Sequence, residues 1–417
     1  MRRALGIGPI LLFAALAASG QTPDPKLVER ARRLLAAAPL IDTHNDLPSM
    51  LLALGGGGLS GVDLGKVQAA LCADVPRLRE GGVGAQYWSV FVESSTMKTH
   101  TSLHEALREF DVTLRFLRGE PAFEVAKTAD DIERIRRSGR IASLIGVEGG
   151  HMIESSPEAL RIFYELGARY MTLTHWDNVE WADAATDRPE QDGLTKQGEK
   201  LVREMNRLGM FVDISHVSPD TMRDALRVTR APVIFSHSNA LAIAGHPRNV
   251  PDDVLRLLTD NGGVIHANFI REFVSPEHAA WTAKRKTEAK GARIRLEDEA
   301  AITQAIAEWE AANPEPRGSI GAVADHIDHL VSVAGIDHVG IGADFYDDGA
   351  ASMAAGLENV TRYPYLFAEL LRRGYSDEDV MKIAGRNHLR AMRQMERVAA
   401  ELRKTEPPLV FEGPGPK

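Results

Sequence analysis

The stretch Phe211-Val-Asp-Ile-Ser-His-Val-Ser-Pro219 contains the unit from which most of the chain is built. Its first four residues form a short, largely apolar run, which predicts a buried strand. Ser218-Pro219 is a helix-start signal, because serine caps a helix and proline fits its first turn. His216 therefore stands between a strand end and a helix start. Seven similar runs recur along the chain, at Leu40–Thr43, Ala85–Val92, Ile141–Val147, Tyr170–Thr174, Val233–Ser236, Gly263–Asn268 and Val339–Ala343.

These runs are continuous rather than alternating in polarity, which is typical of parallel strands covered on both sides. Eight strand–helix alternations without an obvious repeat favour a closed barrel over an open sheet. The sequence therefore predicts an α/β fold, a (β/α)8 TIM barrel whose site lies at the C-terminal ends of the strands. Amphipathic helical stretches separate the runs, as at Ser156–Leu166, Thr195–Leu208, Pro219–Arg227 and Pro251–Thr259.

The first 20 residues are typical of a signal peptide. Met1-Arg-Arg3 is positively charged, Ala4–Ala17 is largely apolar, and Ala18-Ser-Gly20 is a small-residue cleavage site. A membrane-spanning anchor is the alternative, but the apolar run is short for one. We expect a periplasmic or secreted protein without a membrane anchor.

The rest of the chain is expected to form one domain, over residues 21–405. A long, highly charged and largely helical insertion is expected at residues 272–319, as a lid or shielding element. Residues 406–417 are rich in proline and glycine, which predicts a flexible tail.

Composition excludes several classes of function. The net charge of −9 argues against nucleic acid as a partner, because phosphate binding requires clustered lysine and arginine. Cys72 is the only cysteine, which excludes an internal disulfide and a thiolate zinc site. Any metal must be held by histidine and carboxylate side chains.

Residues of this kind follow the ends of six predicted strands. In a barrel these ends share one face, so side chains distant in sequence are expected to meet there. Imidazole and carboxylate ligands suit Zn²⁺, Mn²⁺ or Fe²⁺. Seven such groups exceed what one tetrahedral ion needs, and two ions roughly 3.5–4 Å apart would use them well. The seven are His44, Asp46, Glu148, His175, His216, His237 and Asp344.

Seven ordered motifs around these positions resemble the signature blocks of the membrane (renal) dipeptidases, zinc-dependent enzymes of the amidohydrolase superfamily. The resemblance runs from about residue 36 to about residue 395. The motifs are His44-Asn-Asp46-Leu-Pro48, Gly146-Val-Glu-Gly-Gly-His151, Leu173-Thr-His175, Asp213-Ile-Ser-His216-Val-Ser218, Phe235-Ser-His237-Ser238, Arg248-Asn-Val-Pro-Asp-Asp253 and Gly340-Ile-Gly-Ala-Asp344-Phe345.

The resemblance implies hydrolysis of dipeptides, L,D-dipeptides included, by a hydroxide that bridges two Zn²⁺ ions. It implies one zinc on His44 and Asp46. It assigns the second zinc to His216 and His237, with Glu148 bridging both. A homodimer is a further expectation from the family.

The resemblance also implies roles for three residues around the metals. His175 would contact the substrate carbonyl or the oxyanion formed from it. Arg248 would bind the C-terminal carboxylate of the dipeptide. Asp344 would take a proton from the bridging water and deliver it to the leaving amine.

Three departures from the family pattern leave the substrate open. Asp344-Phe-Tyr-Asp-Asp-Gly349 carries an insertion after the catalytic aspartate, and Asn268-Phe-Ile270 lacks a tyrosine found in many members. The insertion at 272–319 is also longer than usual. An amidohydrolase acting on a non-dipeptide amide or a secondary-metabolite precursor is the alternative, and a non-catalytic binding barrel is a weaker one.

Three further histidine-containing motifs allow other interpretations. Asp325-His-Ile-Asp-His329 looks like a metal motif but falls on an expected outer helix, which favours a structural role. His151 could orient a metal ligand. His266 lies within a strand and could point into the barrel or toward the helices.

Overall fold

The structure is a computed structural model that describes residues 23–54, 57, 59, 61–296, 298–347, 349 and 351–411. The predicted signal peptide, the last six residues of the predicted tail, and Asp348 of the loop after Asp344 lie outside the described residues. Within the described part of the chain, no helix is both long and apolar enough to cross a bilayer.

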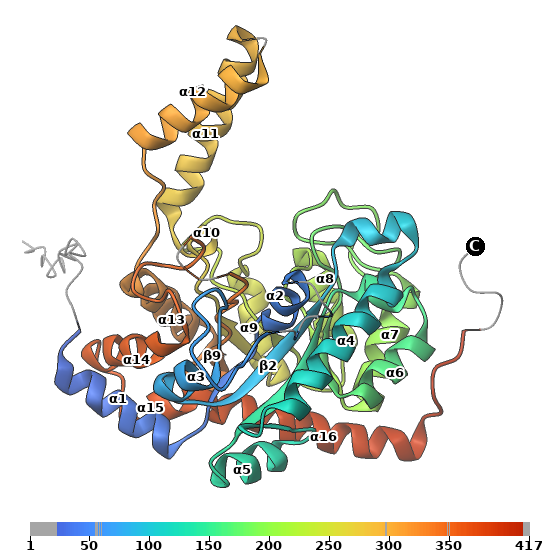
Figure 1. Cartoon of the computed structure of the whole chain (residues 1–417). Coiled ribbons are helices and arrows are strands. Elements are labelled where there is room, and N and C mark those ends of the chain that lie inside the picture. The colour runs from blue at the N-terminus through green and yellow to red at the C-terminus, as the bar shows by residue number, and fades with distance from the viewer. Residues whose placement is uncertain are drawn as a thin grey trace, which may run out of the picture.

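Eight parallel strands close into a barrel, which confirms the predicted (β/α)8 architecture (Figure 1). The order around the barrel is β2-β1-β9-β8-β7-β6-β5-β4, and pairing of β4 with β2 closes it. Every predicted run overlaps one of these strands. Their bounds are β1 Leu40–Asp42, β2 Val83–Phe91, β4 Ile141–Glu148, β5 Ala168–Thr172, β6 Phe211–Asp213, β7 Ile234–Phe235, β8 Val264–Ala267 and β9 Val339–Ile341.

A further short strand, β3 (Phe123–Val125), was not predicted. It pairs with Ile141–Ser143 at the beginning of β4, whereas β5 pairs with Ile145–Glu148 of the same strand. β3 therefore extends the sheet below β5 without belonging to the closed ring.

The helices surround the barrel, and their starts follow local capping chemistry. The Ser156 and Ser218 hydroxyls accept hydrogen bonds from Ala159 N and Thr221 N, at 3.1 Å each, as the helix-start signals predict. The helices are α1 Pro25–Ala37, α2 Leu47–Ala53, α3 Val75–Gly81, α4 Ser102–Gly119, α5 Ala129–Arg137, α6 Pro157–Leu166, α7 Lys196–Leu208, α8 Pro219–Val228, α9 Asp252–Asn261, α10 Arg271–Val274, α11 Pro276–Arg295, α12 Glu299–Ala312, α13 Ile320–Ala334, α14 Tyr363–Arg372, α15 Asp377–Met381 and α16 Asn387–Thr405.

The segment 272–319 folds mainly as a pair of helices, α11 and α12, that extends away from the barrel (Figure 1). It does not lie across the strand ends as a lid would. At its base, Glu315 accepts a hydrogen bond from His278 Nε2 at 2.6 Å and pairs with Arg271. Trp281 Nε1 donates to Asn313 O at 2.7 Å. These contacts anchor the helix pair to the chain next to α10.

A buried polar network lies inside the barrel near α16. It shows in which direction the side chain of His266 points. Side chains from β2, β6 and β8, namely Tyr87, Phe211 and His266, all contact His388 of α16. Strands from different sides of the barrel meet at this one side chain, so His266 points into the barrel.

The hydrogen bonds of this network fix its tautomers. His266 Nδ1 donates to Phe235 O at 2.7 Å, so its Nε2 accepts from His388 Nδ1 at 3.1 Å. His388 Nε2 is then left to accept from the Tyr87 hydroxyl at 2.9 Å. Both imidazoles are therefore neutral and fully paired.

Acidification is expected to destabilise the fold through these two histidines. Burial lowers the pKa of His388 well below its ordinary value and that of His266 to about 4. In the unfolded chain both would titrate near ~6.5, so below that pH the unfolded state binds more protons and the free energy of unfolding falls as the pH falls. His266 should contribute a loss of about 1.5 kcal/mol between pH ~6.5 and ~5, and His388 should contribute a loss of the same sign.

Chemical denaturation of metal-free protein at both pH values measures this loss. His388→Gln keeps a donor and an acceptor without a titrating group, so its free energy of unfolding should fall less between the two pH values than that of the unmodified protein. If the free energy of unfolding fell equally in both proteins, His388 would not be the group that makes stability depend on pH.

Candidate metal centre

The seven predicted side chains meet at the C-terminal ends of the strands, as the barrel topology requires. Each comes from the end of a strand or the first residues after it, and none is more than 8% exposed. His44 and Asp46 follow β1, Glu148 is the last residue of β4, His175 follows β5, His216 follows β6, His237 follows β7 and Asp344 follows β9.

One carboxylate oxygen, Oε1 of Glu148, lies at the centre of this cluster. It faces the Nε2 atoms of His216 and His237 at 3.0 and 3.2 Å. It also faces the Nε2 atoms of His44 and His175 at 3.5 and 3.7 Å. Four imidazoles from four strands thus converge on a single oxygen.

Three overlapping groups of side chains bring ligand atoms within 4.8 Å of one another. Glu148 belongs to two of the groups and His44 to two. His237 lies in the same group as His44, and His175 lies in the same group as His216. The family resemblance, by contrast, assigns His44 and His237 to different zinc ions. The groups are His44, Glu148 and His237; Glu148, His175 and His216; and His44, Asp46 and Asp344.

Backbone contacts hold the loops of this face in place. Asp344 N donates to His44 O at 3.2 Å and Asp46 N donates to Phe345 O at 2.9 Å, which joins the loops after β1 and β9. His216 and Asp344 have φ angles of 66° and 69°, in the left-handed region that non-glycine residues seldom adopt. Such strain persists where the surrounding structure enforces it, as functional sites often do.

Burial governs the charge of the cluster. It raises the pKa of the Glu148 carboxyl to about 7 and that of Asp344 to about 6, against the lowering effect of His44. It lowers the pKa of His216 and His237 well below the ordinary value, and the charge of Arg248 adds to this. His216 and His237 are thus neutral at pH 7, each with a lone pair free for a metal. The pKa of His44, by contrast, is held well above its ordinary value, because the lowering effect of burial is outweighed by Tyr170, Glu148 and Asp46 together.

The unpartnered atoms of the cluster fit divalent metal ions. Among the described residues, His44 Nε2 and Asp46 Oδ1 are buried without a hydrogen-bond partner. The Nε2 atoms of His216 and His237 face each other at 2.9 Å. A cation would satisfy these converging acceptors, which are costly to bury otherwise. The donor set contains imidazole and carboxylate and matches zinc and similar ions.

Two sets of supporting contacts were not predicted from the sequence. Ser236 Oγ lies 2.8 Å from His237 Nδ1 and donates to Asp213 Oδ2 at 2.5 Å, which orients this imidazole. Asn268 Nδ2 donates to Asp344 Oδ2 at 2.8 Å, and Asn268 Oδ1 accepts from Ile270 N at 2.6 Å. The motif Asn268-Phe-Ile270 is evident in the sequence, but only the structure shows that Asn268 hydrogen-bonds the carboxylate of Asp344.

Arg248 lies beside the cluster and is only 1% exposed. It donates to His237 O at 3.2 Å and to Ser238 Oγ at 3.4 Å, and it forms no ion pair among the described residues. Burial lowers its pKa to about 10, against the raising effect of Asp344 and Glu148. A buried guanidinium without a carboxylate partner is well suited to an anionic group of a ligand.

The remaining histidine motifs make contacts that support the fold rather than the cluster. On α13, His326 accepts from Ala240 N and donates to Val274 O, while His329 pairs with Asp252. His151 donates to Val92 O at 2.9 Å and makes no hydrogen bond to the cluster.

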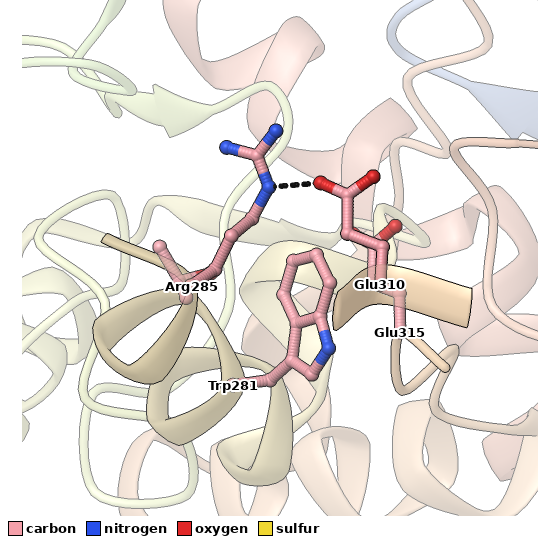
Figure 2. Close-up of a pocket in the computed structure, with 5 residues that line it drawn as sticks. Trp281, Arg285, Glu310 and Glu315 are labelled. Atoms are coloured by element: carbon pink, nitrogen blue, oxygen red, sulfur yellow. Dashed lines mark hydrogen bonds and ion pairs between the residues drawn. The ribbon is translucent and has the colours of Figure 1, made fainter. Parts of the chain in front are cut away.

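A hollow outside the cluster lies within the helix pair of α11 and α12. Figure 2 shows Trp281, Arg285, Glu310 and Glu315 around it, with Arg285 and Glu310 paired. It contains none of the strand-end side chains, so we place the chemistry at the buried cluster.

The fold and the site together define a class of protein: a (β/α)8 barrel with a buried histidine–carboxylate metal centre at its strand ends, as in metal-dependent hydrolases. Sequence comparison narrows the class. The family model of the membrane dipeptidases (peptidase family M19) matches residues 28–406. The chain belongs to this family, and is therefore a hydrolase of the metallopeptidase type.

Individual relatives agree with this assignment. Dipeptidase verJ of Clonostachys rogersoniana is 36% identical over 396 residues, covering 92% of this chain and 91% of the relative. The probable dipeptidase PvdM from Pseudomonas aeruginosa has the same fold, with a TM-score of 0.76, 22% identity, and coverage of 90% and 100% of the two chains. A metallo peptidase from Rhodobacter sphaeroides, solved with a phosphinate mimic of the dipeptide L-Ala-D-Ala, gives a TM-score of 0.69, 23% identity, and coverage of 86% and 99%.

Proposed function

We propose that this chain is a two-zinc dipeptidase that hydrolyses dipeptides with a free C-terminal carboxylate, L,D-dipeptides included. The observation that carries the proposal is the convergence of four histidine Nε2 atoms on Glu148 Oε1, at 3.0 to 3.7 Å. The L-Ala-D-Ala mimic bound to the Rhodobacter sphaeroides neighbour supports the inclusion of L,D-dipeptides among the proposed substrates.

In this proposal His44 and Asp46 would hold one zinc, His216 and His237 would hold the other, and Glu148 would supply a carboxylate to both. When bound, the two ions would lower the pKa of a water between them and polarise the scissile carbonyl. The residues of the chain orient the substrate and move the protons.

Asp344 is the proton carrier of the proposed reaction. Its Oδ1 lies 3.8 Å from His44 Nε2, facing the cluster, while Asn268 holds Oδ2. Burial raises its pKa to about 6 in the metal-free cluster, well above the ordinary value of a carboxyl. A carboxylate with such a pKa can accept a proton from the attacking water and deliver it to the leaving amine.

His175 is proposed to stabilise the oxyanion. Its ring packs against Phe91 at 4.6 Å and Trp176 at 5.2 Å between centroids, which fixes its orientation. Burial lowers its pKa well below the ordinary value, so the imidazole is neutral at pH 7. A neutral imidazole N–H can donate to the oxygen on which negative charge develops.

Arg248 is proposed to bind the C-terminal carboxylate of the substrate. Arg248→Met is therefore expected to lower kcat/KM for free dipeptides by about 100-fold, the equivalent of a strong charge-assisted hydrogen bond. Dipeptide amides lack the carboxylate, so the substitution should change their slow hydrolysis little. Steady-state kinetics on matched pairs of dipeptides and dipeptide amides measure both effects.

Arg169 is the matched control, because it is a buried arginine whose guanidinium bonds only backbone carbonyls. Arg169→Met should reduce stability and leave the preference for the free carboxylate intact. If Arg248→Met lowered the two rates equally, Arg248 would not recognise the carboxylate.

A dipeptide panel tests the proposed function against its alternatives. Metal-loaded protein is incubated with L,L- and L,D-dipeptides, with and without a chelator. We expect chelator-sensitive turnover of both series. Two tightly bound metals per chain without turnover of any dipeptide would overturn the dipeptidase proposal, and would favour a non-dipeptide amide substrate or a binding barrel.

A further inference from the structure

The imidazole of His44 makes a contact on each side of its ring. Nε2 faces the carboxylates of Asp46 and Glu148, both at 3.5 Å. Nδ1 lies 2.8 Å from the hydroxyl of Tyr170, which is fully buried. An imidazole that offers its Nε2 lone pair to a metal carries its proton on Nδ1, and that proton requires an acceptor.

Tyr170 reaches this position from another part of the barrel. It lies on β5, which is not a neighbour of β1 in the sheet. Its register partner on β4 is Gly146, and a Cβ atom there would lie 2.0 Å from Tyr170 Cζ and 2.3 Å from its hydroxyl oxygen. The absence of a side chain at Gly146 therefore provides the space through which the phenol extends toward His44.

We propose that Tyr170 is a positioning residue whose hydroxyl oxygen accepts a hydrogen bond from Nδ1–H of His44, and so fixes the tautomer and orientation in which Nε2 binds metal. This inference rests on the proposed two-metal centre. The phenol stays neutral, because burial raises its pKa well above the ordinary value. Partners of this kind raise the basicity of a metal-binding histidine and hold its ring in place.

Tyr87 offers an internal comparison in the same barrel. It is also fully buried, its ring centroid lies 5.4 Å from that of Tyr170, and its hydroxyl also bonds a histidine, His388, at 2.9 Å. His388 is not among the candidate metal ligands. Both tyrosines are buried, and each hydroxyl lies within hydrogen-bond distance of a histidine. Only the partner of Tyr170, His44, belongs to the metal cluster.

The test compares Tyr170→Phe with Tyr87→Phe in the full chain. Zinc affinity is measured by competition with a chromophoric chelator, and thermal unfolding of the metal-free proteins is followed in parallel. Each variant removes one buried hydroxyl, so both are expected to show lower melting temperatures. Only Tyr170→Phe is expected to bind one of its two zinc ions about 10- to 100-fold more weakly.

The outcomes separate this inference from the proposed function. If the unmodified chain binds no zinc tightly, the two-metal proposal fails. If it binds two zinc ions and Tyr170→Phe binds both with unchanged affinity, only the role of Tyr170 is overturned. An equal loss of zinc affinity in Tyr87→Phe would also overturn it, because the effect would then follow from general loosening of the barrel.

Discussion

Glu148→Gln is expected to lose at least one of its two metal ions and to hydrolyse dipeptides on the order of 10³-fold more slowly. Glu148 Oε1 faces all four histidines of the cluster, so it is the side chain best placed to contact both ions. Glutamine has the same size but no charge, and cannot neutralise two adjacent dications. Metal content after dialysis and kcat/KM on one dipeptide measure the two effects.

Glu109 on α4 provides the matched control. It is also a buried carboxyl whose pKa burial raises well above the ordinary value, and it bonds Ser49 Oγ and Phe91 N instead of the cluster. Glu109→Gln should keep both metals. Unchanged metal occupancy in Glu148→Gln would rule out the bridging role.

Asp344→Asn is expected to reduce kcat by about 10²- to 10⁴-fold while both metals stay bound, because an amide cannot carry the proton. The Asn268 contact that orients the side chain can be kept, since Asn268 Nδ2 can donate to an amide oxygen as it does to Asp344 Oδ2. Rapid-quench or steady-state assays give kcat, and metal analysis of the same sample gives occupancy.

Asp347 lies on the same loop and serves as the control for this substitution. Its carboxylate bonds Gly349 N and Ser352 Oγ within its own turn, both at 2.6 Å. Asp347→Asn should stay within a few-fold of the unmodified rate. Near-normal kcat in Asp344→Asn would show that another group carries the proton.

Much of the fold could be predicted because its strands are buried on both faces and therefore appear as continuous apolar runs. This pattern located even the two-residue strand β7, Ile234–Phe235, within the predicted run Val233–Ser236. It missed β3, Phe123–Val125, because only Phe123 of its three residues is fully buried and no long apolar run marks it. The outward direction of the helix pair α11–α12 also left no sequence signal, since a charged helix can cover a site or project from it.

Site residues could be predicted where their place in the site follows from their position at a strand end. They could not be predicted where their role depends on contacts across the barrel. His44, Glu148 and His216 lie at strand ends or within three residues after them, and parallel topology alone brings strand ends together. The contact of Tyr170 with His44 joins two non-adjacent strands and depends on the space above Gly146. No local pattern encodes such a contact, because it requires the register and the inward direction of side chains on three strands.

The central claim, a two-zinc dipeptidase, is tested most directly by titrating metal-free protein with zinc while following hydrolysis of L-Ala-D-Ala and bound zinc together. We predict that the rate rises with added zinc and reaches its plateau at two bound ions per chain. A plateau at one bound ion, or no hydrolysis at any occupancy, would contradict the claim.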